Sequence, residues 1–364
     1  MVEEEVLMVR SVSVSTRCIR IWAVLVACLC FIPQGGSAEG PIEAQGGGSA
    51  KQTETGLNPE PDYPTFSKDS FWYKPIPKNV PLHEKSDEFS KEFARQVKTY
   101  YGHIAIAFED YSSPLYVAKP DTQNVTVTLW DCARRGKTDQ KLQRDFTSVP
   151  VPTYAEPAGG SDSEMSVYQP STDRLWEFWK ARKVEGSWQA CWGGRMSDVS
   201  KNPGIWPWPY GAAATGLPFA AGQLRASELA QGSIQHVMGI AIVNEEEKTF
   251  SWPANRTDGS NWGKVAHPIP EGLRLRLDPT VDVESLNLHP IAKAIAKAAQ
   301  VYGFVVWDHA GAVTLRAENP KRFTQAGLPN PYPALFAGTR GYALMNRFPW
   351  DKMQFLPMDY GKPQ

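Results

Sequence analysis

Short stretches in which apolar and polar residues alternate recur along this chain of 364 residues and constrain its fold more than any other feature. The clearest are residues 124–130, 174–181 and 273–277. An alternation of period two places one set of side chains on each face of a β-strand. Long connections separate these stretches, and the strand–helix alternation of a doubly wound sheet is absent. The pattern predicts a mainly β fold, a β-sandwich or jelly roll.

Further strand patterns lie toward the C-terminus. Residues 304–307 and 312–316 are apolar or alternating, and residues 308–311 between them are turn-forming. This arrangement predicts a β-hairpin. Residues 233–243 are predicted to form a strand with a buried stretch.

Three segments carry helical signals instead. Residues 86–99 place apolar side chains on one face, and Ser86 is suited to cap the first turn. Residues 289–302 form the strongest helical pattern, with a proline in the first turn and a glycine after the last residue. Residues 225–229 resemble a single helical turn. We expect two or three helices packed at the periphery of the sheets.

The N-terminal segment has the features of an export signal. Three arginines precede the apolar residues 21–32, and the small residues 36–38 follow. A basic region, a short apolar run and a small-residue site are typical of a secretory signal peptide, here residues 1–38. The run is too short for a transmembrane helix, which needs about 20 apolar residues.

Residues 25–28 offer a second interpretation, because they resemble a bacterial lipobox in which Cys28 would carry a lipid anchor. Residues 39–66 are rich in Gly, Ser and Pro and are predicted to be a flexible tether. Residues 67–364 are then a single β-sandwich domain with an irregular, Pro-rich C-terminal tail. The sequence leaves open whether the protein is soluble and extracellular or anchored on the outer or periplasmic side of a membrane.

The amino-acid composition limits the classes of partner that the protein could bind. The chain has 38 Lys and Arg against 39 Asp and Glu, and no basic stripe that would indicate a nucleic-acid surface. Its 13 Trp are the compositional oddity, since the indole suits both cores and flat ligand faces. The sequence does not specify an oligomeric state.

The domain contains two of the five cysteines, Cys132 and Cys191, which form either one disulfide or two separate buried thiols. No Cys/His cluster has zinc spacing, so no metal is expected. The sequence also lacks a P-loop, a dinucleotide-binding glycine pattern, a metalloprotease motif and a nucleophile elbow. No cofactor is expected, and any catalysis uses dispersed residues.

The segment 173–195 is the first candidate site. It is predicted to be a hairpin, with a helix over 173–183 as the rival interpretation. Carboxylates framed by indoles are what carbohydrate sites use, since Trp stacks on sugars and an apolar wall raises a carboxyl pKa. The candidate catalytic residues here are Asp173 and Glu177, and the candidate substrate-binding residues are Trp179, Trp188, Trp192 and Arg195. Strand positions four apart are separated by about 13 Å, so one carboxylate needs a partner elsewhere, such as Asp258 or Asp110.

A second candidate set is built on His236 within the apolar stretch 233–243. A histidine buried beside a partner can be a tuned base, although a structural hydrogen-bonding role is the more ordinary one. Elimination beside a uronate would pair it with the guanidinium groups of Arg195 and Arg256 and with Tyr111 or Tyr116 as the acid. Asp258 and Asp308 with His309 carry turn signals as well.

Several motifs together resemble an uncharacterised family of secreted bacterial proteins over about residues 69–318. They lie at 69–72 with 75–77, 111–116, 176–179, 192–194, 222–228, 232–236, and 271–272 with 277–279. The resemblance implies export and a link to extracellular polysaccharide, and it assigns no catalytic residue.

These observations lead to three expectations. The first is an exported carbohydrate-active protein, a hydrolase or a lyase acting on an extracellular polysaccharide. The second is a non-catalytic glycan-binding or cell-envelope protein on the same fold. The third is a protein-interaction or adhesion module.

Overall fold

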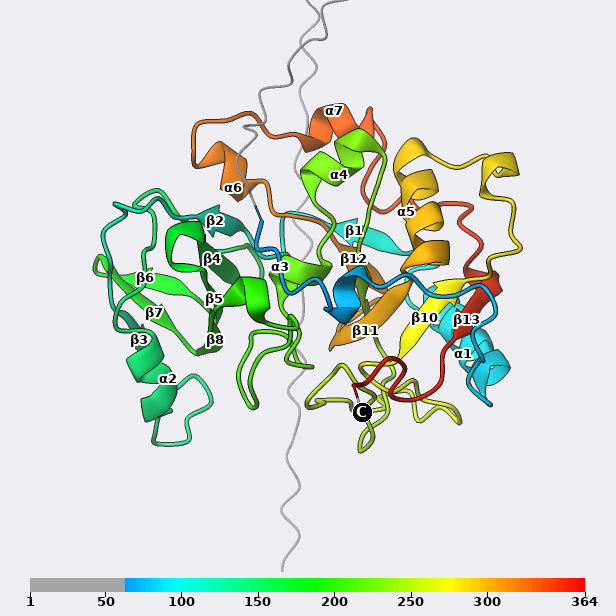
Figure 1. Ribbon diagram of the computed structural model, residues 1–364, viewed down its shortest axis with the longest axis horizontal. Helices are drawn as coiled ribbons and strands as arrows, with labels where there is room; N and C mark the ends of the chain where they lie inside the picture. Colours follow the sequence, from blue (N-terminus) through cyan, green and yellow to red (C-terminus); the bar gives the residue numbers. More distant parts are fainter. Residues whose placement is uncertain (1–62, 364) are drawn as a thin grey trace, which may run out of the picture. The chain divides into compact units, whose positions relative to one another are not determined.

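Thirteen β-strands in three mixed sheets organise residues 63–363, the part of the chain that the computed structural model describes (Figure 1). Short helices surround the sheets, which fits the mainly β class that the sequence predicts. The sheets by themselves do not establish a sandwich or a jelly roll. The signal segment and Cys28 lie outside the described residues. Tyr63 and Phe66, at the end of the predicted tether, are buried against the domain.

The largest sheet has six strands and forms one half of the described region (Figure 1). Its order is β1 (Ala105–Ala107), β12 (Thr314–Arg316), β9 (Met238–Ile242), β11 (Phe304–His309), β10 (Arg274–Leu277) and β13 (Met353–Phe355). Helices α1 (Ser86–Thr99) and α5 (Pro290–Val301) contribute their apolar faces to the core on one side of this sheet. Both helices match the predicted periodicity to within a residue or two.

Two local predictions at this sheet are wrong. Strands β11 and β12 do not form a hairpin, because β9 lies between them, parallel to β11 and antiparallel to β12. All five residues of β9 are buried, so this apolar strand takes the central position that a hairpin would have closed. Ser86 begins α1 but does not cap it, since its Oγ accepts a hydrogen bond from the Phe355 backbone N–H at 3.0 Å.

The second and third sheets form the other half (Figure 1). One contains β2 (Leu115–Val117), β4 (Met165–Gln169), β5 (Arg174–Trp179) and β8 (Trp192–Ser197), and the other contains β3 (Val127–Leu129), β7 (Ser187–Ala190) and β6 (Arg182–Val184). The predicted hairpin over 173–195 is confirmed as two nested antiparallel pairs, β5 with β8 and β6 with β7. Trp179 and Trp192 are directly opposite each other.

Three hydrophobic clusters hold the described region together. One lies under α1 and α5, and another lies between the second and third sheets and α2 (Gln140–Asp145). The cluster between them draws Leu175 and Met196 from the second sheet and Val305 and Trp307 from the large sheet. The two sheets therefore share one core.

The remaining helices are short. They are α3 (Phe219–Gly222), α4 (Ala226–Gln231), α6 (Lys321–Thr324), α7 (Tyr332–Phe336) and the 3-10 turns Phe71–Tyr73, Pro170–Thr172, Val199–Lys201, Val283–Ser285 and Trp350–Lys352. Helix α4 is the helical turn predicted at 225–229. The C-terminal tail adds β13 to the edge of the large sheet beside β10.

Strand β11 contains one irregularity that matters for the candidate site. Its pairing with β9 shifts register between Val306 and Asp308, so Trp307 is an extra residue in the ladder. Such a bulge re-aims the side chains that follow it. Trp307 packs across Gly239, where a Cβ would approach the indole to 2.2 Å. Asp308 then pairs with Ala241, whose side chain faces the core shared by the two sheets.

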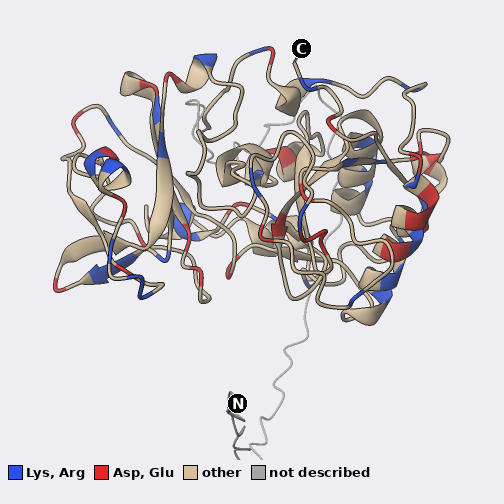
Figure 2. Cartoon of the chain, turned by 90° about the horizontal axis from the view of Figure 1, so that it is seen from below, with Lys and Arg blue, Asp and Glu red and all other residues tan. Residues whose placement is uncertain are grey.

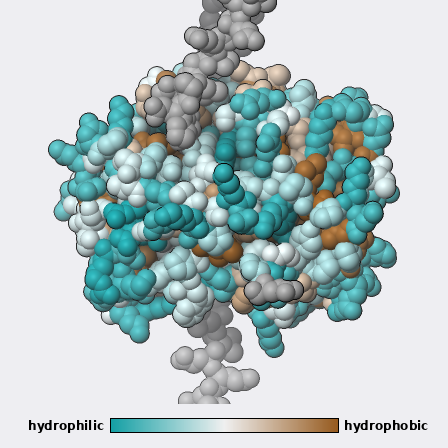
Figure 3. Space-filling model, in the orientation of Figure 1, coloured by the Kyte–Doolittle hydropathy of each residue, from teal (hydrophilic) through white to brown (hydrophobic). Residues whose placement is uncertain are grey.

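The surface of the described region is of mixed character. Basic and acidic residues are interspersed along the elements (Figure 2). The face shown in Figure 3 is mainly hydrophilic, with hydrophobic residues gathered mostly on the side of α5. Among residues 63–363, no helix has both the length and the apolar character needed to cross a membrane.

Candidate functional site

A cleft of about 680 Å³ lies where the second and third sheets approach the end of β11. One wall carries Trp130, Trp179 and Trp192 together with the bond between Cys132 and Cys191. The opposite wall carries residues 256–258 and the pair Asp308 and His309. This volume is in the range of small-molecule sites in proteins.

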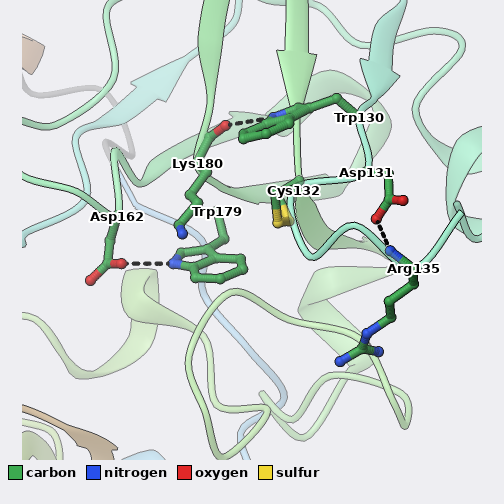
Figure 4. The surroundings of a disulfide bond; sticks show 8 residues. Trp130, Asp131, Cys132, Arg135, Asp162, Trp179 and Lys180 are labelled. Atoms are coloured by element: carbon green, nitrogen blue, oxygen red, sulfur yellow. Dashed lines mark hydrogen bonds between the residues drawn. A yellow bond between two sulfur atoms is a disulfide. The ribbon is translucent and has the colours of Figure 1, made fainter. Parts of the chain in front are cut away.

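The aromatic wall is held in place by polar partners. Trp179 donates a hydrogen bond from Nε1 to Asp162 Oδ1 at 3.0 Å, and the two side chains point toward each other in Figure 4. The Lys180 ammonium lies 4.4 Å from the centre of the Trp179 ring. Trp192 stacks on Tyr210 with ring centres 5.7 Å apart. These contacts fix two indoles at the cleft.

The disulfide anchors a loop at the same wall. Cys132 and Cys191 are bonded, with their Cα atoms 5.6 Å apart, and they lie 59 positions apart in the sequence. Cys191 lies between β7 and β8, so the bond ties the 131–139 segment to the hairpin (Figure 4). Asp131 accepts hydrogen bonds from the backbone N–H groups of Arg135 and Gly136 at 2.9 and 2.6 Å. This loop brings Arg135 and Lys137 to the cleft.

An imidazole surrounded by carboxylates lies on the opposite wall. His309 Nδ1 donates to Glu245 Oε2 at 3.0 Å, and Glu245 is fully buried. This hydrogen bond raises the pKa of His309, and the charges of Asp258 and Asp308 act in the same direction. No hydrogen-bond partner for His309 Nε2 occurs within the described residues. Glu245 thus fixes the orientation of the imidazole through Nδ1, and Nε2 is left to interact with a ligand.

Asp258 lies next to this histidine and reaches solvent. The cleft walls exclude enough water from its carboxylate to raise its pKa, and the nearby His309 and Arg256 charges oppose that effect. Its backbone N–H donates to Glu271 Oε2 at 3.2 Å. Burial raises the pKa of Glu271 well above its ordinary value.

An ion-paired cluster contains two residues of the cleft lining, Glu164 and Asp308, and this part of the lining is named the floor. Arg316 donates to Glu164 Oε1 at 2.9 Å and to Asp308 Oδ2 at 2.6 Å, which joins the two halves of the described region. Burial raises the pKa of Glu164 to about 7 and that of Asp308 to about 6, although Arg316 opposes both shifts. Two carboxylates therefore share one guanidinium.

Arg256 has a positioning role. Its guanidinium donates hydrogen bonds to the carbonyls of residues 209, 210, 211, 213 and 214, including those of Ala213 at 2.6 Å and Ala214 at 2.7 Å. Burial lowers its pKa. Since its donors are directed at backbone carbonyls, Arg256 shapes the cleft wall instead of providing the substrate clamp that the sequence predicts.

Four of the predicted site residues come together here, together with the cysteine pair. Asp258, Trp179, Trp192 and Arg256 all line the cleft, and so do Cys132 and Cys191. The hairpin explains two of them, because β5 and β8 end side by side at Trp179 and Trp192.

Glu177 and His236 do not reach the cleft. Glu177 is fully buried and accepts hydrogen bonds from Trp206 Nε1 and the Ala220 backbone N–H, both at 3.1 Å. Burial raises the pKa of Glu177 to about 8. His236 is 2% exposed, donates from Nδ1 to the Val237 carbonyl and lies 3.1 Å from Glu228 Oε2. Both are interior hydrogen-bonding residues, because the faces that carry them point into the protein.

The other predicted residues also lie elsewhere. Asp173, at the far end of β5, accepts from the Ser200 hydroxyl at 2.7 Å, and Arg195 pairs with Asp145 at 3.1 Å. Trp188 and Tyr116 are buried in the cluster between the second and third sheets. Tyr111 is 44% exposed and does not line the cleft.

Sequence reasoning missed Glu164, Asp162, Glu245, Asp308 and His309. A signal for two of them was present, since Glu245 lies three residues after the buried strand β9 and His309 is the last residue of β11. The carboxyl ends of parallel strands meet at one sheet edge, and β9 and β11 are parallel. The sequence pattern of residues 308–311 indicates a hairpin turn, so the position of His309 at the end of a parallel strand was not recognised.

Within residues 63–363, no group of three or more His, Cys, Asp or Glu side chains is arranged to hold a metal ion. Comparison with protein-family models, curated proteins and solved structures finds no match to this chain. The cleft geometry is therefore the basis for assigning a function.

Proposed function

We propose that this protein is an exported carbohydrate-active enzyme that hydrolyses glycosidic bonds in an extracellular polysaccharide. The observation that carries the proposal is the meeting of Trp179 and Trp192 with Asp258 and His309 in one cleft. Export, as a soluble form or with a lipid on Cys28, and a β-sandwich or jelly-roll arrangement are parts of the same proposal. The core shared by two sheets supports that arrangement.

The aromatic wall supports glycan binding. Indole rings stack on the C–H faces of sugars, and two oriented indoles can hold successive residues of one chain. The polar groups on the opposite wall would then face the glycosidic bond.

The opposite wall supports acid–base catalysis. His309 is held by Glu245 and surrounded by carboxylates, so its protonated form is favoured and Nε2–H can donate a proton to the leaving oxygen. Asp258 in its ionised form can activate a water or stabilise positive charge on the sugar ring. Glu245 serves as the positioning residue for the imidazole.

The charge of the cleft favours a hydrolase over a lyase. Six acidic residues line it, Asp131, Asp139, Asp162, Glu164, Asp258 and Asp308, against the basic residues Arg135, Lys137 and Arg256 and the protonated His309. Arg256 is directed at backbone carbonyls. A uronate, the substrate class of elimination, would meet like charges.

Incubation of the purified protein with a panel of polysaccharides tests the proposal. New reducing ends are expected, without the ultraviolet absorbance of unsaturated ends. Trp179→Ala should weaken the reaction about tenfold or more by removing a stacking face. Trp262→Ala is the matched control, because Trp262 is 74% exposed and outside the cleft. Retention on an insoluble glycan without product would instead favour the non-catalytic binding protein.

The pH dependence of kcat/KM is expected to be bell-shaped. Activity requires ionised Asp258 and protonated His309, and both pKa values are raised above their ordinary values. Activity should therefore fall on the acid side at a higher pH than an ordinary Asp would give. On the alkaline side it should persist above the ordinary histidine pKa. A profile without an alkaline limb would contradict the role of His309.

A further inference from the structure

Glu164 has an unused oxygen at the floor of the cleft. Its side chain is almost fully buried, with 1% exposure for the residue, and Oε1 is bonded to Arg316 at 2.9 Å. Oε2 has no hydrogen-bond partner among residues 63–363. A buried carboxylate oxygen without a partner is costly, and such groups are rare in native proteins. Since Glu164 lines the cleft, a bound ligand is the natural source of the missing donor.

The floor also has an excess of negative charge. Glu164 and Asp308 share the single guanidinium of Arg316, so one negative charge has no counter-ion when both carboxylates are ionised. Asp162 adds another, and in the described region no cation forms an ion pair with it. The Lys180 ammonium is nearby but lies over the Trp179 ring. A ligand group that carries a positive charge and an N–H donor would form a hydrogen bond with Glu164 Oε2 and would also neutralise part of this negative charge.

The same carboxylates adjoin an aromatic face. Asp162 precedes Glu164 by two positions and is bonded to Trp179 Nε1. A sugar stacked on Trp179 would therefore have its substituents beside Asp162 (Figure 4). Glu164 lines the same cleft. One pyranose with a positively charged substituent matches both features.

We propose that Glu164 and Asp162 bind the protonated amine of an amino sugar, so that the preferred substrate is a polysaccharide with free amino groups. This inference rests on the proposed function and names its substrate class. An ammonium has three N–H donors and a positive charge. An N-acetyl group has one N–H donor and no charge, and a uronate would be repelled.

Binding of three pentasaccharides near neutral pH tests the inference: glucosamine, N-acetylglucosamine and galacturonate oligomers. Titration calorimetry is carried out on full-length protein carrying Asp258→Asn in every sample, so that ligands are not cleaved. The amino oligomer is expected to bind at least about tenfold more tightly than its acetylated counterpart. The uronate oligomer should bind most weakly, and added salt should reduce the preference for the amine.

Charge-neutral variants assign the preference to the two carboxylates. Glu164→Gln and Asp162→Asn should each bring the ratio of the two affinities toward one, while affinity for the acetylated oligomer changes less than about twofold. Glu185→Gln in the β6–β7 turn is the matched control and should leave the ratio unchanged. Asp162 is only partly buried, so Asp162→Asn keeps the test valid if Glu164→Gln fails to fold.

The outcomes of these experiments distinguish failure of the amine subsite from failure of the proposed glycan hydrolysis. Equal affinity for the amino and acetylated oligomers, or a preference unchanged in both variants, would overturn the amine subsite and leave glycan hydrolysis standing. If no pentasaccharide binds and no polysaccharide is cleaved, both proposals fail.

Discussion

Asp258→Asn and His309→Gln are each expected to lower the turnover number for glycan hydrolysis by a factor of about 10²–10⁴. Each change removes one half of the proton transfer and preserves the approximate size of the side chain. Since neither residue provides an aromatic face, KM should change much less than kcat. Initial rates of reducing-end formation measure the effect.

Two matched control variants accompany this prediction. Asp121→Asn and His267→Asn alter exposed residues away from the cleft and should retain full activity. Glu245→Gln should give a smaller loss and move the alkaline limb of the pH profile downward, because the hydrogen bond to Glu245 raises the pKa of His309. Full activity in both cleft variants would remove this wall from the mechanism.

Loss of the disulfide is expected to destabilise the domain by about 4 kcal/mol, since the bond closes a loop of 59 positions. The Cys132→Ala, Cys191→Ala double variant should show this as a lower urea midpoint for unfolding. Activity should fall as well, because the 131–139 loop loses its anchor beside Trp179.

The wild-type protein under reducing conditions provides the control for this variant. It should unfold at the same denaturant concentration as the double variant, which would assign the effect to the bond and not to the packing of the thiols. A double variant within about 1 kcal/mol of the oxidised protein would contradict the entropic account.

Local periodicity of the sequence was enough to predict several elements of the fold. The spacing of Phe89, Phe93 and Val97 is enough to specify α1, and Pro290 with Gly303 brackets α5. The hairpin of β5 and β8 could be predicted because its alternation and its turn are adjacent in sequence. All of these features depend on residues within a few positions of one another.

Pairing between distant segments could not be predicted in this way. The central position of β9 between β11 and β12 depends on contacts across about 70 positions, and nothing local distinguishes it from a hairpin. Glu177 illustrates the same limit at the site. Alternation places Glu177 on the same strand face as Leu175, and in the folded protein that face lies in the core between two sheets.

The cleft residues that were predicted each have a local signal in the sequence. Trp179 and Trp192 lie opposite each other in a predicted hairpin, whereas Asp258 follows a turn signal that also marks cleft loops. Glu164 and Asp308 were not predicted as site residues because they come together only through their ion pairs with Arg316. These three residues lie far apart in the sequence or on different strands, so no local pattern links them.

The bulge at Trp307 makes the cleft depend on the length of strand β11. With regular alternation, Asp308 would follow Phe304 and Val306 into the apolar core under α5. The extra residue turns it toward the cleft and sets the place of His309 beside Glu245. Deletion of one residue in this strand would therefore take Asp308 and His309 out of the cleft lining, although both residue types remained in the chain.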